Sequence, residues 1–176
     1  WGQNLVLFEN LRAIYEPFNQ SRRVVGFDTF EGYASISNND KASDTIKEGG
    51  YATSKNYNEY LESLIDYHEK NNVLGAIKKH TLVKGDVTKT APEYFSNNSN
   101  LIIALAYFDM ALYEPSKAAL QAIKPHLITG SVLMLDEFNN YDYPGETKAF
   151  KEVFNDVSYK AIKSRYMNDR TFIIIL

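Results

Sequence analysis

The hydrophobic pattern of this chain predicts strands that alternate with helices. The clearest unit begins with Leu101 to Phe108, a near-continuous apolar run of strand length. Apolar residues at helical spacing follow in Ser116 to His126, and a second strand-like run covers Ser131 to Leu135. This order is typical of a crossover between parallel strands, which is almost always right-handed. We therefore expect both strands in one sheet, with Leu101 to Phe108 in its interior and buried on both faces.

Acidic residues stand at the carboxyl ends of both predicted strands. Asp109 follows the first strand directly, and Asp136 and Glu137 follow the second. The carboxyl ends of parallel strands meet at the same edge of a sheet, where open α/β sheets bind their ligands. The sequence therefore predicts that these three carboxylates gather at one edge.

The remaining segments extend the alternation over the whole chain. Leu5 to Phe18 carries Leu7, Leu11 and Ile14 on one helical face. Further helices are expected at Tyr57 to Asn71, Thr90 to Phe95 and Lys148 to Phe154, and further strands at Arg22 to Phe27, His80 to Lys84, Val157 to Tyr166 and Thr171 to Leu176. The last two strands are joined so closely that they must form an antiparallel hairpin. The pattern predicts an α/β fold, mostly parallel, with an antiparallel C-terminal strand.

A polar stretch from Ala34 to Lys55 interrupts this pattern. It is rich in Ser, Asn, Asp and Gly and has almost no apolar periodicity, which predicts a long loop. A lid over the functional site and a plain flexible insertion are equally compatible with its composition.

Composition narrows the classes of function. The chain has 176 residues, 44% of them apolar, and a net charge of only −3, so one globular domain is expected and the basic footprint of a nucleic-acid binder is absent. It has no cysteine, which excludes disulfides and thiolate metal sites. It also has no apolar run near the roughly 20 residues of a membrane span and no recognisable secretory signal. We expect a cytoplasmic protein whose partners are small molecules.

The candidate chemistry is carried by carboxylates. Neither of the common glycine-rich phosphate loops occurs, and no Ser or Cys nucleophile has a recognisable surrounding motif. Converging carboxylates repel one another unless a hard divalent cation such as Mg²⁺ joins them, although acids that merely cap strand ends are an equally supported alternative. Asp28 follows another strand and suits two ribose hydroxyls, or else caps a turn. Asp86 is a fourth acid at a strand end.

Five segments, in this order, resemble the macrocin O-methyltransferase family. They are GFDTFEG (26–32), KGDVTKT (84–90), AYFDMALYEPSKAAL (106–120), LDEFN (135–139) and PGETKAF (144–150). The resemblance implies a class I S-adenosylmethionine-dependent methyltransferase with a Rossmann-like, seven-stranded sheet whose last strand is antiparallel. It also implies that the chain as given lacks the first strand and part of the glycine-rich loop.

The resemblance assigns roles to single residues. It implies S-adenosylmethionine contacts by Gly2, Asn4, Asp28, Thr29, Asp86, Val87 and Asp109, with Asp28 on the ribose and Asp86 beside the adenine. It implies Asp109, Asp136 and Glu137 as ligands of Mg²⁺ or another divalent cation. Family members commonly have a second acid two residues after the first, where this chain has Ala111. The general base is not identified by sequence, and Glu146 and Glu31 are the candidates.

The function implied is O-methylation of a sugar hydroxyl, on a nucleotide-linked deoxysugar, with S-adenosylmethionine and a divalent metal. Two alternatives stay open: a methyltransferase for another vicinal diol or catechol-like molecule, and a domain that binds S-adenosylmethionine or a nucleotide without catalysis. The expected partner is a sugar or nucleotide sugar, without nucleic acid or membrane, and a homo-oligomer is one option for assembly.

Overall fold

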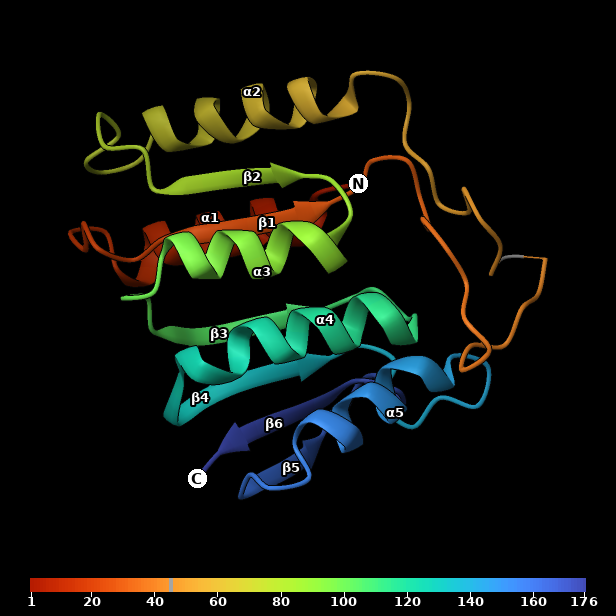
Figure 1. Cartoon of the computed structure of the whole chain (residues 1–176). Coiled ribbons are helices and arrows are strands. Elements are labelled where there is room, and N and C mark those ends of the chain that lie inside the picture. Colours follow the sequence, from red (N-terminus) through yellow and green to blue (C-terminus); the bar gives the residue numbers. More distant parts are fainter. Residues whose placement is uncertain (45) are drawn as a thin grey trace. The chain divides into compact units, whose positions relative to one another are not determined.

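The structure, a computed structural model, describes residues 1–44 and 46–176, which form two compact units (Figure 1). The first comprises Trp1–Gly32 and Tyr51–Gly85, and the second comprises Tyr33–Gly50 and Asp86–Leu176. The single domain expected from chain length stays a prediction. None of the helices in the described residues has the length and apolar character that crossing a membrane requires.

The first unit combines a parallel strand pair with two helices. Strands β1 (Val24–Asp28) and β2 (His80–Lys84) pair in register, and helices α1 (Gln3–Tyr15) and α2 (Tyr57–Lys70) contact them and each other. A buried cluster of Phe30, Leu61 and Ile65, with Leu5, Val6, Tyr57 and Leu82 packed against it, forms its core. This unit carries Asp28 at the last position of β1.

The second unit holds a four-stranded sheet with helices over it. Its strands β3 (Ile103–Phe108), β4 (Leu127–Leu135), β5 (Tyr159–Lys163) and β6 (Thr171–Ile175) lie in the order β3-β4-β6-β5. Strands β3 and β4 are parallel, and β6 is antiparallel to both β4 and β5. Helices α3 (Val87–Asn97), α4 (Tyr113–Ile123) and α5 (Pro144–Val153) accompany them, with a short 3₁₀ helix, η1 (Lys124–His126), before β4.

The core of the second unit follows from period-two burial in its central strands. Every second residue of β4 from Ser131 to Leu135, and of β6 from Thr171 to Ile175, is buried. Helices α4 and α5 lie over one face of this sheet in Figure 1, and Leu120 and Phe150 of these helices are fully buried. Apolar side chains on one strand face and one helix face thus form a shared core.

Most predicted elements are confirmed, including the parallel crossover from β3 to β4 and the antiparallel hairpin of β5 and β6. The family resemblance predicts one seven-stranded sheet, or that sheet without its first strand. The described residues instead form six strands in two separate sheets. The interior position predicted for Leu101 to Phe108 is wrong in these residues, because β3 pairs only with β4. Leu105 is accordingly 46% exposed.

The apolar face predicted for the first helix is also wrong. Leu7 is 51% exposed and Ile14 is 69% exposed, whereas the buried residues of α1 are Glu9 and Arg12. The reason is that α1 buries charged side chains against α2, where they form an ion network. Amphipathic spacing therefore identified the helix but not its buried side.

The long polar loop is confirmed in its described residues, and Tyr33–Gly50 belongs to the second unit. Asp40 holds it there: Oδ1 accepts a hydrogen bond from the backbone N of Tyr113 (2.7 Å), and Oδ2 accepts from the N and Oγ of Ser37. Helix α4 has Leu112 at its N-cap, with no side-chain cap of its own, so Asp40 replaces the missing cap. A side chain at Gly145 would overlap with the Asp40 carboxylate. That the loop covers a site stays a prediction.

Replacing this cap is expected to weaken the second unit. Asp40→Ala should lower the free energy of unfolding by about 1 kcal/mol, the usual value of a helix N-cap, because the N-terminus of α4 loses its acceptor. Urea unfolding followed by circular dichroism measures this. Asp44→Ala, an exposed acid of the same loop, is the matched control and should change stability little. Equal effects of the two substitutions would contradict the capping role.

Candidate functional site

The paired ends of β3 and β4 bring the predicted metal-binding acids to one edge. Phe108 is level with Leu135 in the parallel register, and the N of Asp136 donates to the carbonyl of Phe108 (3.1 Å). Asp109 and Asp136 therefore leave neighbouring strands at the same height, and Glu137 follows. The convergence predicted from the crossover is confirmed for these strand ends.

Burial, reinforced by neighbouring acids, disfavours the charged forms of Asp109 and Glu137 at this edge. Asp109 is an exposed residue, but partial desolvation of its carboxyl, followed by the charge of Asp136, raises its pKa. Burial likewise raises the pKa of Glu137, opposed by a short hydrogen bond from Asn140 to its Oε2 and reinforced by nearby acids. A nearby cation favours the charged form of such carboxylates.

Glu146, one of the candidates for the general base, lies directly beside these acids. It is in the first turn of α5, fully buried, and its Oε1 accepts a hydrogen bond from the backbone N of Glu137 (3.0 Å). Its Oε2 has no hydrogen-bond partner among the described residues. Burial, and then the charge of Glu137, raises the pKa of Glu146 to about 8. Glu146 thus holds the backbone of the loop after β4 through this hydrogen bond.

Sequence analysis missed Arg170 and Tyr107, which complete this edge. The Nε and a terminal nitrogen of Arg170 both contact Oδ1 of Asp136, and the Arg170 side chain donates to the hydroxyl of Tyr107 (3.2 Å). The guanidinium carbon also lies 5.6 Å from the centroid of the Tyr107 ring. The signal for Arg170 was its place one residue before β6, which becomes informative only once Thr171 is known to pair with Leu135.

The chemistry of this edge suits a hard divalent cation. Asp109, Asp136 and Glu137 supply oxygen donors, and Glu146 adds a buried carboxylate oxygen without a partner. Such donor sets are what Mg²⁺ and its relatives bind. The carboxylates do not form a closed site. In the described residues, no three of these acids have ligand atoms that all lie within 4.8 Å of one another.

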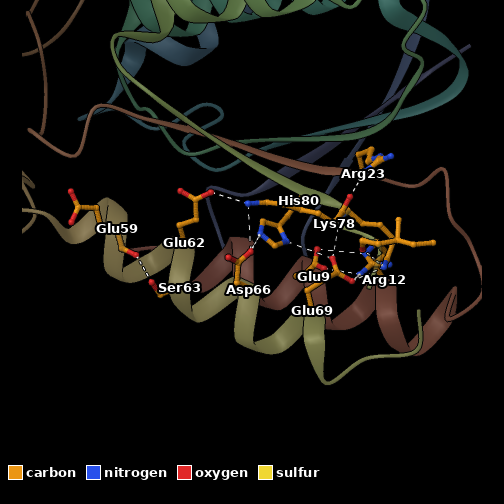
Figure 2. Close-up of polar contacts among 12 residues, drawn as sticks. Glu9, Arg12, Arg23, Glu59, Glu62, Ser63, Asp66, Glu69, Lys78 and His80 are labelled. Carbon is orange, nitrogen blue, oxygen red and sulfur yellow. Dashed lines mark hydrogen bonds and ion pairs between the residues drawn. The ribbon is translucent and has the colours of Figure 1, made fainter. Parts of the chain in front are cut away.

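The group that does meet this spacing is Glu9, Glu69 and His80 in the first unit. Figure 2 shows these side chains in a network with Arg12, between α1, α2 and the start of β2. Glu69 Oε1 lies 2.9 Å from Arg12 and 2.7 Å from Lys79, all three side chains being almost fully buried. Because two cations already neutralise its carboxylates, this group is a structural ion network.

The predicted cofactor-binding residues fall in both units. In the first, Gly2 caps α1 with a left-handed backbone (φ 83°), Asn4 lies in the first turn of α1, and Asp28 Oδ1 accepts from the N of Phe30 (2.7 Å). Thr29 bonds to the carbonyl of Gly32 in the same turn. A Cβ on Gly2 would overlap with the side chain of Leu61, so glycine is required there.

The other predicted cofactor residues, Asp86 and Val87, and the second candidate base, Glu31, lie at a helix start and on an exposed turn. In the second unit, Asp86 caps α3 by accepting from the N of Thr88 (2.9 Å), and Val87 opens that helix. Glu31, in the first unit, is exposed on the turn after β1. Asp28 and Asp86 thus make the capping contacts of the simpler alternative, and their cofactor roles stay predictions.

Known structures resemble this chain over nearly its whole length. The calicheamicin methyltransferase CalS11 superimposes with a TM-score of 0.90 at 38% identity, covering 98% of this chain and 68% of that one. Its apo structure, named a TDP-rhamnose 3'-O-methyltransferase of calicheamicin biosynthesis, gives 0.78 at 36% identity, covering 98% and 66%. The O-methyltransferase NovP gives 0.72 at 16% identity, covering 97% and 66%, which shows the shared fold alone.

The chain therefore spans about two thirds of the length of these enzymes. Comparison with family models and with curated protein sequences gave no match.

Proposed function

This chain belongs to the macrocin O-methyltransferase family of S-adenosylmethionine-dependent O-methyltransferases, and we propose that it methylates a hydroxyl group of a nucleotide-linked deoxysugar with the help of a divalent cation. Identity of 38% over 98% of the chain supports the class of reaction. The relative named a TDP-rhamnose 3'-O-methyltransferase supports the class of substrate. The acid-rich edge at the ends of β3 and β4 is the observation that carries the metal.

Each component has residues proposed to hold it. S-adenosylmethionine, which supplies an electrophilic methyl group, is assigned to Gly2, Asn4, Asp28, Thr29, Asp86, Val87 and Asp109. The cation, which would ligate neighbouring sugar hydroxyls and lower their pKa, is assigned to Asp109, Asp136 and Glu137. An acceptor oxygen must then stand in line with the methyl group, about 3 Å away. Glu146 serves this arrangement by fixing the backbone of Glu137.

Glu146 is better suited to positioning than to taking the substrate proton. Its side chain is fully buried, and one carboxylate oxygen is engaged by the protein backbone. A general base needs to reach the proton that it abstracts.

The place of a second family acid is taken by Ala111, which is 6% exposed with a left-handed backbone (φ 60°). Turnover therefore has to be measured, because binding alone would leave a non-catalytic role open.

The test is formation of S-adenosylhomocysteine by the purified protein. It is incubated with S-adenosylmethionine, Mg²⁺ and a panel of nucleotide deoxysugars, the corresponding free sugars and catechols. Product with nucleotide deoxysugars only is the expected result. Product with catechols alone would favour the vicinal-diol alternative, and cofactor binding without any product would favour a binding domain.

The ribose role of Asp28 can be separated from its role in the turn. Asp28→Asn keeps an oxygen for the N of Phe30 but loses the charge and one acceptor. We expect the binding of S-adenosylmethionine to weaken by roughly 1 to 3 kcal/mol, the range for lost hydrogen bonds to a charged group. Isothermal titration calorimetry measures the affinity. Glu59→Gln, an exposed acid of the same unit, should leave it unchanged, and a Asp28→Asn variant that binds normally would end the ribose assignment.

A further inference from the structure

The ion pair between Arg170 and Asp136 occupies one of the two carboxylate oxygens that Asp136 can offer a metal. Both contacting nitrogens of the guanidinium approach the same atom, Oδ1 of Asp136. The two side chains are largely buried, with 26% of Arg170 and 18% of Asp136 exposed. Water therefore screens this pair less than an ordinary surface pair.

We propose that Arg170 is the resident counter-ion of the acid-rich edge, and that a divalent cation binds there only by displacing its guanidinium from Asp136. This inference rests on the proposed function, because it presupposes a cation at Asp109, Asp136 and Glu137. It adds that the chain's own arginine competes with that cation and sets its affinity.

The need for displacement follows from charge and spacing. A cation on Asp136 would lie within a few ångströms of the guanidinium, where two positive charges repel strongly. With Arg170 in place, the three acids do not reach the mutual 4.8 Å spacing of a closed ligand group in the described residues. Removing the guanidinium from Oδ1 frees Asp136 to turn toward Asp109. The two carboxylates are already close enough for the charge of Asp136 to raise the pKa of Asp109, and a shared cation would offset this repulsion.

Arg170 also has a second partner that can retain it after displacement. Its side chain donates to the hydroxyl of Tyr107 at 3.2 Å, and its guanidinium lies 5.6 Å from the centroid of that ring. A guanidinium beside an aromatic face is stabilised by cation–π attraction. The side chain can therefore leave Asp136 while keeping a contact with β3, which makes the exchange a local movement.

The affinity for Mn²⁺ alone tests the competition without any turnover. Mn²⁺ binding to the purified protein is followed by electron paramagnetic resonance for the unaltered chain, R170Q and R165Q. We expect R170Q to bind Mn²⁺ about tenfold more tightly, the lower end of what a hydrogen bond to a charged group contributes. R165Q removes the same charge from an exposed position of the same hairpin and controls for net charge. Affinity of R170Q no higher than that of R165Q overturns the proposal.

A second measurement uses the unaltered protein and does not depend on how R170Q folds. The Nε–H resonance of Arg170, assigned by its absence in R170K, is followed during titration with Mg²⁺. We expect it to shift and to exchange faster with water as Asp136 is taken over. An unmoved resonance at saturating Mg²⁺, with metal bound, overturns this inference but leaves the proposed function intact. Absence of Mn²⁺ and Mg²⁺ binding in every form overturns both this inference and the metal dependence.

Discussion

Removal of divalent cations with EDTA is expected to abolish methyl transfer, and Mg²⁺ is expected to restore it. The reason is the proposed cation at the edge formed by Asp109, Asp136 and Glu137, which would ligate sugar hydroxyls and lower their pKa. A bound cation stabilises developing charge by several kcal/mol, so its loss should cost about a hundredfold or more in rate. Formation of S-adenosylhomocysteine before and after dialysis measures the effect. Full activity in EDTA would return these acids to the role of strand-end caps.

A single substitution tests the role of the metal site without a chelator. Asp136→Asn should lower turnover about a hundredfold while S-adenosylmethionine affinity changes little, because Asp136 is assigned to the metal and not to the cofactor. Asp169→Asn is the matched control, an exposed acid of the hairpin that accepts from Asn140. An equal fall in cofactor affinity and turnover would show that Asp136→Asn damages the fold or the cofactor site instead. Unfolding curves of both variants complete the comparison.

The acid-rich edge illustrates what the sequence can predict. Parallel strands in a crossover unit end on the same side, so the approach of Asp109 to Asp136 followed from hydrophobic runs and chain order alone. The same reasoning could not find Arg170, because its position depends on how β6 pairs with β4. That register places Thr171 opposite Leu135 and joins residues far apart in the chain. Pairing of this kind is a tertiary property that local patterns do not contain.

Edge positions and buried charges escaped prediction for related reasons. The apolar run of β3 suggested an interior strand, but the burial of a strand depends on its neighbours, and β3 has β4 alone in the described residues. In α1, Glu9 and Arg12 have the composition of a solvent-exposed face. They are buried because Glu69 of α2 pairs with Arg12, and Lys79, just before β2, pairs in turn with Glu69. Complementary charges from separate segments cannot be recognised from either segment alone.

This buried network is expected to hold the first unit together, with Glu69 at its centre. Glu69 Oε1 contacts both Arg12 and Lys79, and Oε2 accepts from the backbone N of Lys79 (3.2 Å). It therefore links α1, α2 and the segment entering β2, which pairs with the strand that ends in Asp28.

Glu69→Ala should therefore lower the free energy of unfolding by about 3 to 5 kcal/mol, the usual cost of leaving buried charges without their partner. Lys79, whose side chain is fully buried, would lose the carboxylate that neutralises it, and Arg12, at 3% side-chain exposure, would keep Glu9 as its partner. Urea unfolding measures the loss. The matched control is Glu62→Ala on the same helix, whose exposed pair with Lys78 should contribute less than about 1 kcal/mol. Similar losses for both would mean that the network is not central to stability.

The difference in the free energy of unfolding between the unaltered chain and Glu69→Ala should depend on pH, which supplies an independent check. Burial opposes ionisation of Glu69, but its polar contacts with Glu9 and Lys79 and the charges of Arg12 and Lys79 outweigh it and lower the pKa from 4.5 to about 2. A carboxyl whose pKa is lower in the folded state stabilises fully above its unfolded value and loses that contribution as pH falls toward the folded value. The advantage of the unaltered chain over Glu69→Ala should thus be constant near neutrality and shrink between about pH 4.5 and pH 2. An advantage that stays constant down to about pH 2 would contradict the lowered pKa of Glu69.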